Sequence, residues 1–153
     1  MSISKFVSCA ALASALLVTP VVSGPAVAQQ QPKMVLSGGL ALWTVAVKPD
    51  RTAQYEELLG KVRTALKSSD KPERQEQARH WKVVRMSQAM PDGNIGYLHI
   101  VSEPVKDADY TVIRILYEGF PDEARALYDQ YMECFAGNVS LASGTVAMDM
   151  ASQ

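Results

Sequence analysis

Three hydrophobic patterns follow one another in the first half of the chain, and each predicts a different kind of segment. Residues 6–22 are mostly small and aliphatic and include no charged residue. From Val35 to Val47 both alternating sets of positions are largely apolar, which predicts a strand in a sheet that is covered on both sides. From 52 to 68 apolar residues recur every three or four positions, which predicts an amphipathic helix packed on that sheet.

A polar stretch separates this helix from the next strand. Residues 72–79 begin with a proline suited to a helix start and contain no large apolar residue, which predicts a short, exposed polar helix or turn. Strand-like runs follow at 81–88 and 95–101, joined by Met90–Asn94, where Pro and Gly supply the backbone angles of a tight turn. These two runs predict a β-hairpin.

The C-terminal third predicts a helical region and then a last strand. Apolar residues at helical spacing predict one helical piece at 107–117 and a second at 122–137. The carboxylate of Asp122 is expected to cap the second piece, as that of Asp50 is expected to cap the helix at 52–68. The run at 145–150 predicts the closing strand.

The predicted order is strand, helix, strand, strand, helix, strand, which is the split βαβ arrangement of a ferredoxin-like fold. The sequence therefore predicts an α+β domain in which helices cover one face of a four-stranded antiparallel sheet. Both faces of the first strand are apolar, however, at Leu40/Leu42 and at Trp43/Val45. We expect a homodimer in which the uncovered faces of two sheets pack into a barrel, because a monomer would expose a large apolar patch.

Several stretches of the chain resemble the dimeric α+β barrel superfamily, which includes antibiotic-biosynthesis-monooxygenase-like and stress-responsive barrel domains. They are Trp43–Asp50 leading into Tyr55–Leu59, then Trp81–Arg85, and Ala108–Tyr110 leading to Glu118–Pro121. Within that superfamily the chain is most similar to small exported bacterial proteins of unknown function. The resemblance implies the fold but no reaction, since members include cofactor-independent oxygenases, haem-degrading enzymes, decarboxylase-like and dehalogenase-like proteins, and domains without known activity.

The N-terminus has the features of a Sec-type signal peptide. Lys5 precedes the apolar run, and the small residues Ala26-Val27-Ala28 follow it, which predicts cleavage between Ala28 and Gln29. A membrane anchor is the alternative, but the run is shorter than a spanning helix needs and contains a proline. We therefore expect a signal peptide at 1–28, a flexible leader at 29–34 and one domain at 35–150, exported to the periplasm or the medium without a stable membrane anchor.

Charge and cysteine content restrict the partners of the exported chain. Removing residues 1–28 takes away Lys5 and no acid, which leaves 14 Lys and Arg against 16 Asp and Glu and a net charge of −2. Such a chain lacks the basic surface that nucleic acids require. Only Cys134 remains, so no intrachain disulfide is possible. We expect a buried, inert thiol, with a reactive thiol or an intermolecular bridge as the alternatives.

Histidine 99 is the best candidate for chemistry. The chain has no nucleophile, metal-protease or phosphate-loop motif and no paired cysteines, so no cofactor and no metal are expected. His99 falls in a predicted strand with Tyr97 and Val101 on its face, where it could act as an acid or base or as a haem or metal ligand. A histidine held by neighbouring side chains is the alternative. His80, in the polar stretch, is expected to be solvated.

Charged and aromatic residues in predicted strands supply the remaining candidates. Arg85 is a second catalytic candidate, and it and Asp149 are expected either at a sheet edge or paired inside a cavity. Trp43 and Tyr97 are candidates for a pocket that holds a small apolar ligand, with core packing as the alternative.

Two functional hypotheses follow, and the sequence leaves open whether the protein is an enzyme. The first is an exported binding or interaction domain that dimerises through its sheet and encloses a small hydrophobic ligand. The second is a small oxygenase-like or haem-processing enzyme with its site in the barrel cavity, where His99 would be the ligand or base and Trp43, Tyr97 and Arg85 would position the substrate.

Overall fold

Four antiparallel strands form one sheet in the order β2-β3-β1-β4. The computed structural model describes residues 32–150, so the predicted signal peptide and the cleavage site at Ala28 and Gln29 lie outside the described residues. The strands are β1 (Leu40–Val47), β2 (Trp81–Ala89), β3 (Ile95–Ser102) and β4 (Phe135–Gly144). This strand order and the antiparallel pairing confirm the predicted α+β, ferredoxin-like fold.

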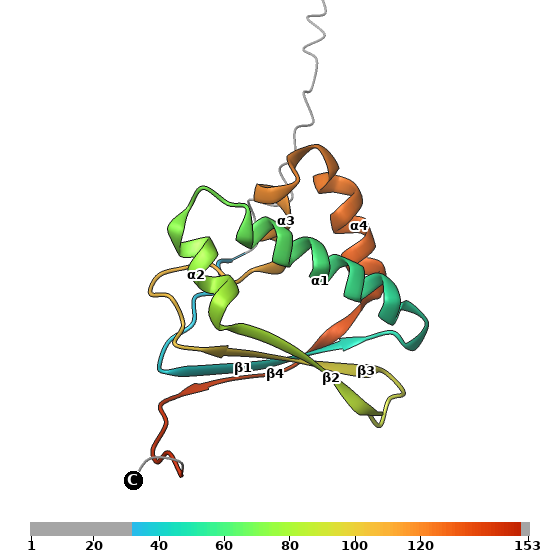
Figure 1. Ribbon diagram of the computed structural model, residues 1–153. Coiled ribbons are helices and arrows are strands. Elements are labelled where there is room, and N and C mark those ends of the chain that lie inside the picture. The colour runs from blue at the N-terminus through green and yellow to red at the C-terminus, as the bar shows by residue number, and fades with distance from the viewer. Residues whose placement is uncertain (1–31, 151–153) are drawn as a thin grey trace, which may run out of the picture.

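The helices of residues 32–150 all lie on one side of the sheet (Figure 1). They are α1 (Thr52–Lys67), α2 (Pro72–His80), α3 (Val112–Gly119) and α4 (Ala124–Cys134). The second helix of the ferredoxin-like order is thus divided into α3 and α4, which confirms the two predicted pieces. Beyond β4, the chain runs away from the sheet on the side opposite the helices (Figure 1).

The hairpin of β2 and β3 closes as predicted. The amide of Met90 donates to the carbonyl of Asn94 at 2.8 Å, and the amide of Gly93 donates back to Met90 at 2.8 Å. Gly93 has a φ of +82°, a left-handed conformation that glycine adopts at the lowest cost.

The predicted closing strand at 145–150 is wrong. The last strand is β4, at Phe135–Gly144, and residues 145–150 form no regular element, so Asp149 is not in a strand. The sequence of β4 is rich in Gly, Ser and Asn, which are poor strand formers, and its start continues the helical spacing of α4. Pairing with the central strand, for example Leu141 opposite Trp43, decides the conformation instead.

The predicted aspartate caps are also wrong. Asp50 and Asp122 lie inside short 3-10 helices at Pro49–Arg51 and Pro121–Glu123, and neither α1 nor α4 has a side-chain cap. In both places the proline before the aspartate, which favours the first position of a helix, begins the 3-10 helix one residue before that aspartate. The carboxylate is thereby moved past the cap position.

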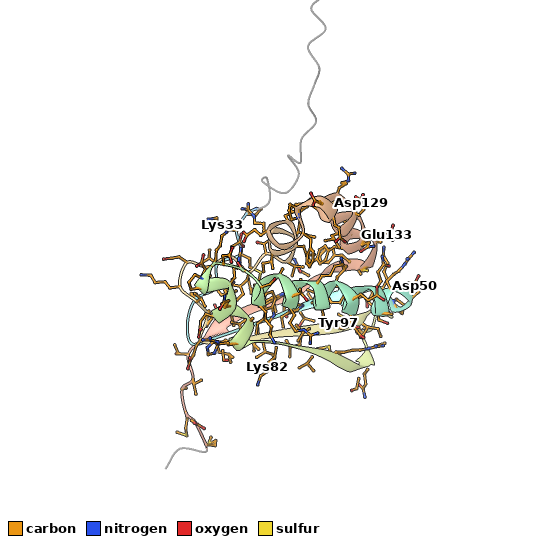
Figure 2. The ribbon with its side chains drawn as sticks, turned by 45° about the horizontal axis from the view of Figure 1, so that its top comes forward. Lys33, Asp50, Lys82, Tyr97, Asp129 and Glu133 are labelled. Atoms are coloured by element: carbon orange, nitrogen blue, oxygen red, sulfur yellow. The ribbon has the colours of Figure 1, made fainter. Side chains whose placement is uncertain are left out.

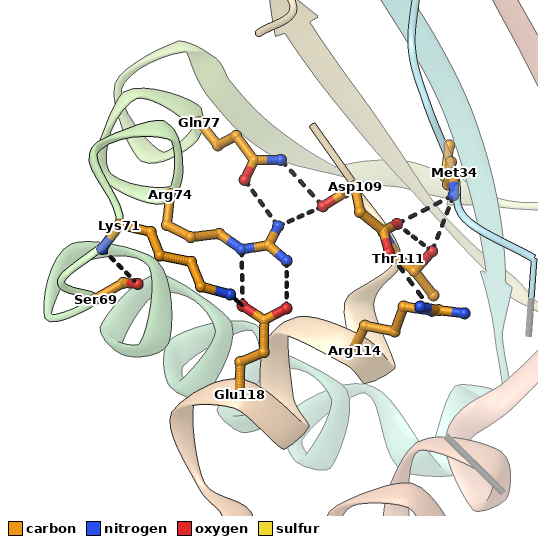
Figure 3. A network of polar contacts seen from close by, with 9 residues as sticks. All are labelled: Met34, Ser69, Lys71, Arg74, Gln77, Asp109, Thr111, Arg114 and Glu118. Carbon is orange, nitrogen blue, oxygen red and sulfur yellow. Dashed lines mark hydrogen bonds and ion pairs between the residues drawn. The ribbon is translucent and has the colours of Figure 1, made fainter. Parts of the chain in front are cut away.

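The polar stretch at 72–80 is not an exposed insertion. It forms α2, and Arg74 and Gln77 on it are only 5% and 0% exposed. Arg74 makes a two-pronged ion pair with Glu118 of α3 and also donates to the backbone carbonyl of Asp109, to which Gln77 donates as well (Figure 3). The Asp109 carboxylate in turn accepts hydrogen bonds from Met34 and Thr111. This network joins α2, α3 and the N-terminal segment.

Both faces of the sheet are apolar, but helices of residues 32–150 cover only one of them. On the helix face, the side chains of Ala41, Trp43, Val45 and Val47 are buried beneath the helices. The opposite face carries apolar side chains that are partly buried or exposed: Leu40, Leu42, Val84, Met86, Leu98 and Ile100. We call this the open face. No helix of residues 32–150 lies on the open face (Figure 1).

Candidate functional site

His99 lies on the helix face of β3 and is completely buried. Its Nδ1 is 3.1 Å from the indole Nε1 of Trp81, and its Nε2 is 3.0 Å from the hydroxyl of Tyr55. The ring of Trp43 stacks on it with centroids 4.6 Å apart. The imidazole is therefore surrounded by side chains from β2, α1 and β1.

These contacts fix the protonation state of His99. An indole N–H only donates, so Nδ1 of His99 accepts and the neutral ring carries its proton on Nε2, which donates to Tyr55. Burial lowers the pKa of His99 to about 4, because a charged ring loses its hydration there. Burial likewise raises the pKa of Tyr55. The single in-plane lone pair of the neutral ring, on Nδ1, accepts from Trp81 and is therefore not free for a metal or a haem iron.

Among the other sequence candidates, Trp43 contacts His99 directly, whereas Tyr97, Arg85 and His80 are bonded to other side chains. Tyr97 lies between α1 and the sheet (Figure 2) and donates to the carboxylate of Glu56 at 2.7 Å, and Arg85 binds the same oxygen at 3.1 Å. Burial, reinforced by Glu56, raises the pKa of Tyr97. His80 is half-buried and bonded to Glu76. All these residues lie on the helix side, so a space between two paired open faces would contain none of them.

Sequence reasoning missed both partners of His99. Tyr55 is one of the apolar-stripe positions of α1, and Trp81 begins β2, yet no local pattern assigns either of them to a histidine. The strand register is the only indication that Trp81 contacts His99. Once β2 pairs with β3 so that Val83 lies opposite His99 and Trp81 opposite Val101, the indole is two residue pairs along the sheet from the imidazole and on the same face.

A large cleft lies on the helix side at the edge strand β4. It has a volume of about 870 Å³ and is bounded by β4, by α3 and α4, and by the segment at 32–35. Its apolar lining comes from Met34, Val35, Trp43, Val45, Tyr110, Val112, Tyr131, Met132, Phe135, Val139 and Leu141. Lys33 is the one charged lining residue within residues 32–150. Trp43 is thus a wall of this cleft, whereas Tyr97 and His99 are not.

The walls of the cleft combine buried and exposed aromatic and aliphatic groups. Tyr131 stacks on Phe135 with centroids 5.5 Å apart, and burial raises the pKa of Tyr131 to about 12, which keeps the phenol neutral. Val139 and Leu141 are 52% and 63% exposed. The cleft therefore offers a largely apolar surface whose polar atoms come from hydroxyl and amide groups and whose one charged lining group within residues 32–150 is Lys33.

Three further findings concern the described residues. Cys134 is fully buried, and burial raises the pKa of its thiol. No three His, Cys, Asp or Glu side chains between residues 32 and 150 are grouped so as to hold a metal ion. Within the same residues, none of the helices has the length and hydrophobicity that crossing a membrane requires.

Comparison with protein-family models, with curated proteins and with solved structures found no match.

Proposed function

We propose that this protein is an exported, homodimeric domain of the dimeric α+β barrel kind, and that it binds a small hydrophobic ligand in the cleft beside β4. The observation that carries this proposal is the cleft itself. Its volume of about 870 Å³ lies within the range of roughly 300–1,000 Å³ that is usual for small-molecule sites.

The exposed apolar walls of the cleft support a bound ligand. Val139 and Leu141 are more than half exposed although they face the helix side of the sheet. Apolar surface in water costs roughly 25 cal/mol per Å². A ligand seated between β4 and α4 removes that cost, which explains why an edge strand carries large aliphatic groups beside its Gly and Ser residues.

The state of His99 favours binding over catalysis. The alternative, an oxygenase-like or haem-processing enzyme, relied on His99 as a ligand or base, but its two nitrogens are engaged by Trp81 and Tyr55 and its pKa is lowered to about 4. The cleft itself is lined by hydroxyl, amide and amine groups rather than by an acid and base pair.

The open face supports the homodimer. Val84 and Met86 are 48% and 39% exposed, and Leu42, Leu98 and Ile100 lie beside them only partly buried. A twofold pairing of two open faces buries all of these groups at once, and the two clefts stay accessible because they lie on the helix side. Export follows from the signal peptide expected at residues 1–28.

The cleft is tested with a neutral fluorescent probe, N-phenyl-1-naphthylamine, titrated into the protein purified after export. The double variant Val139→Ser/Leu141→Ser removes two apolar walls, and we expect it to weaken probe binding roughly tenfold. The matched control is Val146→Ser/Met148→Ser. These side chains are somewhat more exposed, at 66% and 72%, and lie outside the cleft.

Two results would contradict the proposal. Equal probe affinity in the cleft variant and the control would show that the cleft is not the site. A Soret band on haem addition that disappears in His99→Ala, with an unchanged melting temperature, would instead favour the haem-processing alternative.

A further inference from the structure

A second hollow lies on the helix side at the other edge of the sheet, between α1 and β2. It has a volume of about 440 Å³ and shares no lining residue with the cleft. We call it the α1–β2 groove. Its apolar surface comes from Leu59, Val62, Leu66, Ala78, Trp81 and Val83, and its other lining residues are Glu56, Gly60, Arg63 and Lys67.

Gly60 is the first unusual feature of this groove. It lies in the interior of α1 (Thr52–Lys67), where glycine destabilises a helix relative to alanine. Internal packing explains another helical glycine: a Cβ added to Gly119 would come within 2.4 Å of the Cβ of Ala65. A Cβ added to Gly60 would meet nothing within 4 Å. The open space beside Gly60 is the groove, so the missing side chain enlarges the groove and exposes the helix backbone to an occupant.

The charges along α1 are the second unusual feature. Glu56 is neutralised by Arg85 and receives the Tyr97 hydroxyl. Arg63 and Lys67 form no ion pair within residues 32–150. They are also four residues apart on one helix, an arrangement in which like charges repel. An anion bound between them would remove that repulsion.

We propose that the α1–β2 groove binds a single-chain anionic amphiphile, a free fatty acid. The acyl chain would lie on the apolar surface of Leu59, Trp81 and Val83 and pass close to the backbone at Gly60. The carboxylate would lie between Arg63 and Lys67. The space beside Gly60, the apolar surface, and two cations without an ion pair within residues 32–150 are together complementary to an acyl chain that ends in an anionic group.

Isothermal titration of the exported protein with decanoate tests the proposal, with decanol as the uncharged analogue. Neutralising the cations in Arg63→Gln/Lys67→Gln is expected to weaken decanoate binding roughly fivefold to tenfold and to leave decanol binding unchanged. The matched control Lys106→Gln/Arg125→Gln makes the same change of net charge on exposed residues outside the groove and is expected to bind both molecules normally.

Gly60→Leu tests the shape of the groove. Leucine favours a helix more than glycine does, and the added side chain enters open space, so the melting temperature is expected to rise or stay equal. Binding of both decanoate and decanol is expected to fall at least tenfold. A loss of affinity without a loss of stability is a result that a merely structural role for Gly60 does not give.

Each contrary outcome has a distinct meaning. Unchanged decanoate affinity in Gly60→Leu and in the charge variant, or no decanoate binding at all, overturns the groove inference. Loss of decanoate binding in Val139→Ser/Leu141→Ser would place the ligand in the cleft and leave the proposed function standing. Binding to anionic phosphatidylglycerol vesicles, with none to free decanoate, would replace the fatty acid by a membrane surface and likewise overturn the inference.

Discussion

We expect the protein to lose stability between pH 7.5 and pH 5, and we expect His99→Gln to remove most of that loss. In the folded chain the ring is buried between Trp43, Trp81 and Tyr55 and has a pKa of about 4, against an ordinary value of 6.5. The unfolded chain therefore binds a proton at His99 before the folded chain does. Stability that is fully present above pH 6.5 is lost as the pH falls towards 4.

The size of this effect follows from the two pKa values. Each pKa unit corresponds to about 1.36 kcal/mol, so the loss approaches about 3 kcal/mol once the pH is below 4. At pH 5 it amounts to about 2 kcal/mol relative to pH 7.5. Glutamine does not titrate, so His99→Gln should lack this component, although it should be less stable than the wild type by about 1–3 kcal/mol at pH 7.5 because packing and hydrogen bonds are lost.

Urea denaturation at both pH values, at one protein concentration, measures the difference. Fixed concentration matters because the unfolding midpoint of the proposed homodimer would depend on it. Tyr55→Phe is the matched control. It removes the acceptor of the Nε2 proton and costs a similar amount of stability, but it keeps the titrating ring and should therefore keep the pH dependence. An equal dependence on pH in His99→Gln and the wild type would refute the reasoning, because the buried neutral histidine could then not be its source.

Three other predictions concern different parts of the molecule. Arg74→Ala should lower the free energy of unfolding by about 2–4 kcal/mol, since it removes the two-pronged ion pair with Glu118 and one of the two donors to the Asp109 carbonyl. Lys71→Ala, which removes the exposed partner of the same Glu118, should cost less than about 1 kcal/mol in the same urea denaturation. Light scattering should give a mass of two chains at micromolar concentration, and Leu98→Asp on the open face should halve that mass. Mass spectrometry of the exported protein should find Gln29 as its first residue, and a longer product that keeps the apolar run would contradict export by cleavage.

The parts of the fold that local chemistry determines could be predicted from the sequence. The apolar stripe of α1, the turn at Met90–Asn94 and the doubly apolar strand around Trp43 each depend on neighbours a few positions away. For the same reason the ferredoxin-like order could be predicted even though the length of several elements differed. What failed was β4, whose small and polar residues become a strand only because β1 lies beside them.

The burial of α2 could not be predicted, because its partners are distant in sequence. Arg74 meets Glu118 across 44 residues, and Gln77 meets Asp109 across 32. A helix without large apolar residues normally lies in water. Here buried polar contacts replace an apolar face. The composition of 72–80 alone gives no indication of the two acceptors, the Asp109 carbonyl and the Glu118 carboxylate.

His99 shows that the residue type alone does not indicate whether a side chain is available for catalysis. The sequence could place His99 on the same face of its strand as Tyr97 and Val101, but availability for catalysis depends on whether one ring nitrogen is free. The indole N–H of Trp81 donates to Nδ1 of His99, and Nε2 donates to the hydroxyl of Tyr55. Trp81 also forms a wall of the α1–β2 groove, so a molecule in the groove would meet the indole and not the imidazole behind it. The side chain that fixes the ring of His99 thus separates it from the hollow that we propose as a fatty-acid site.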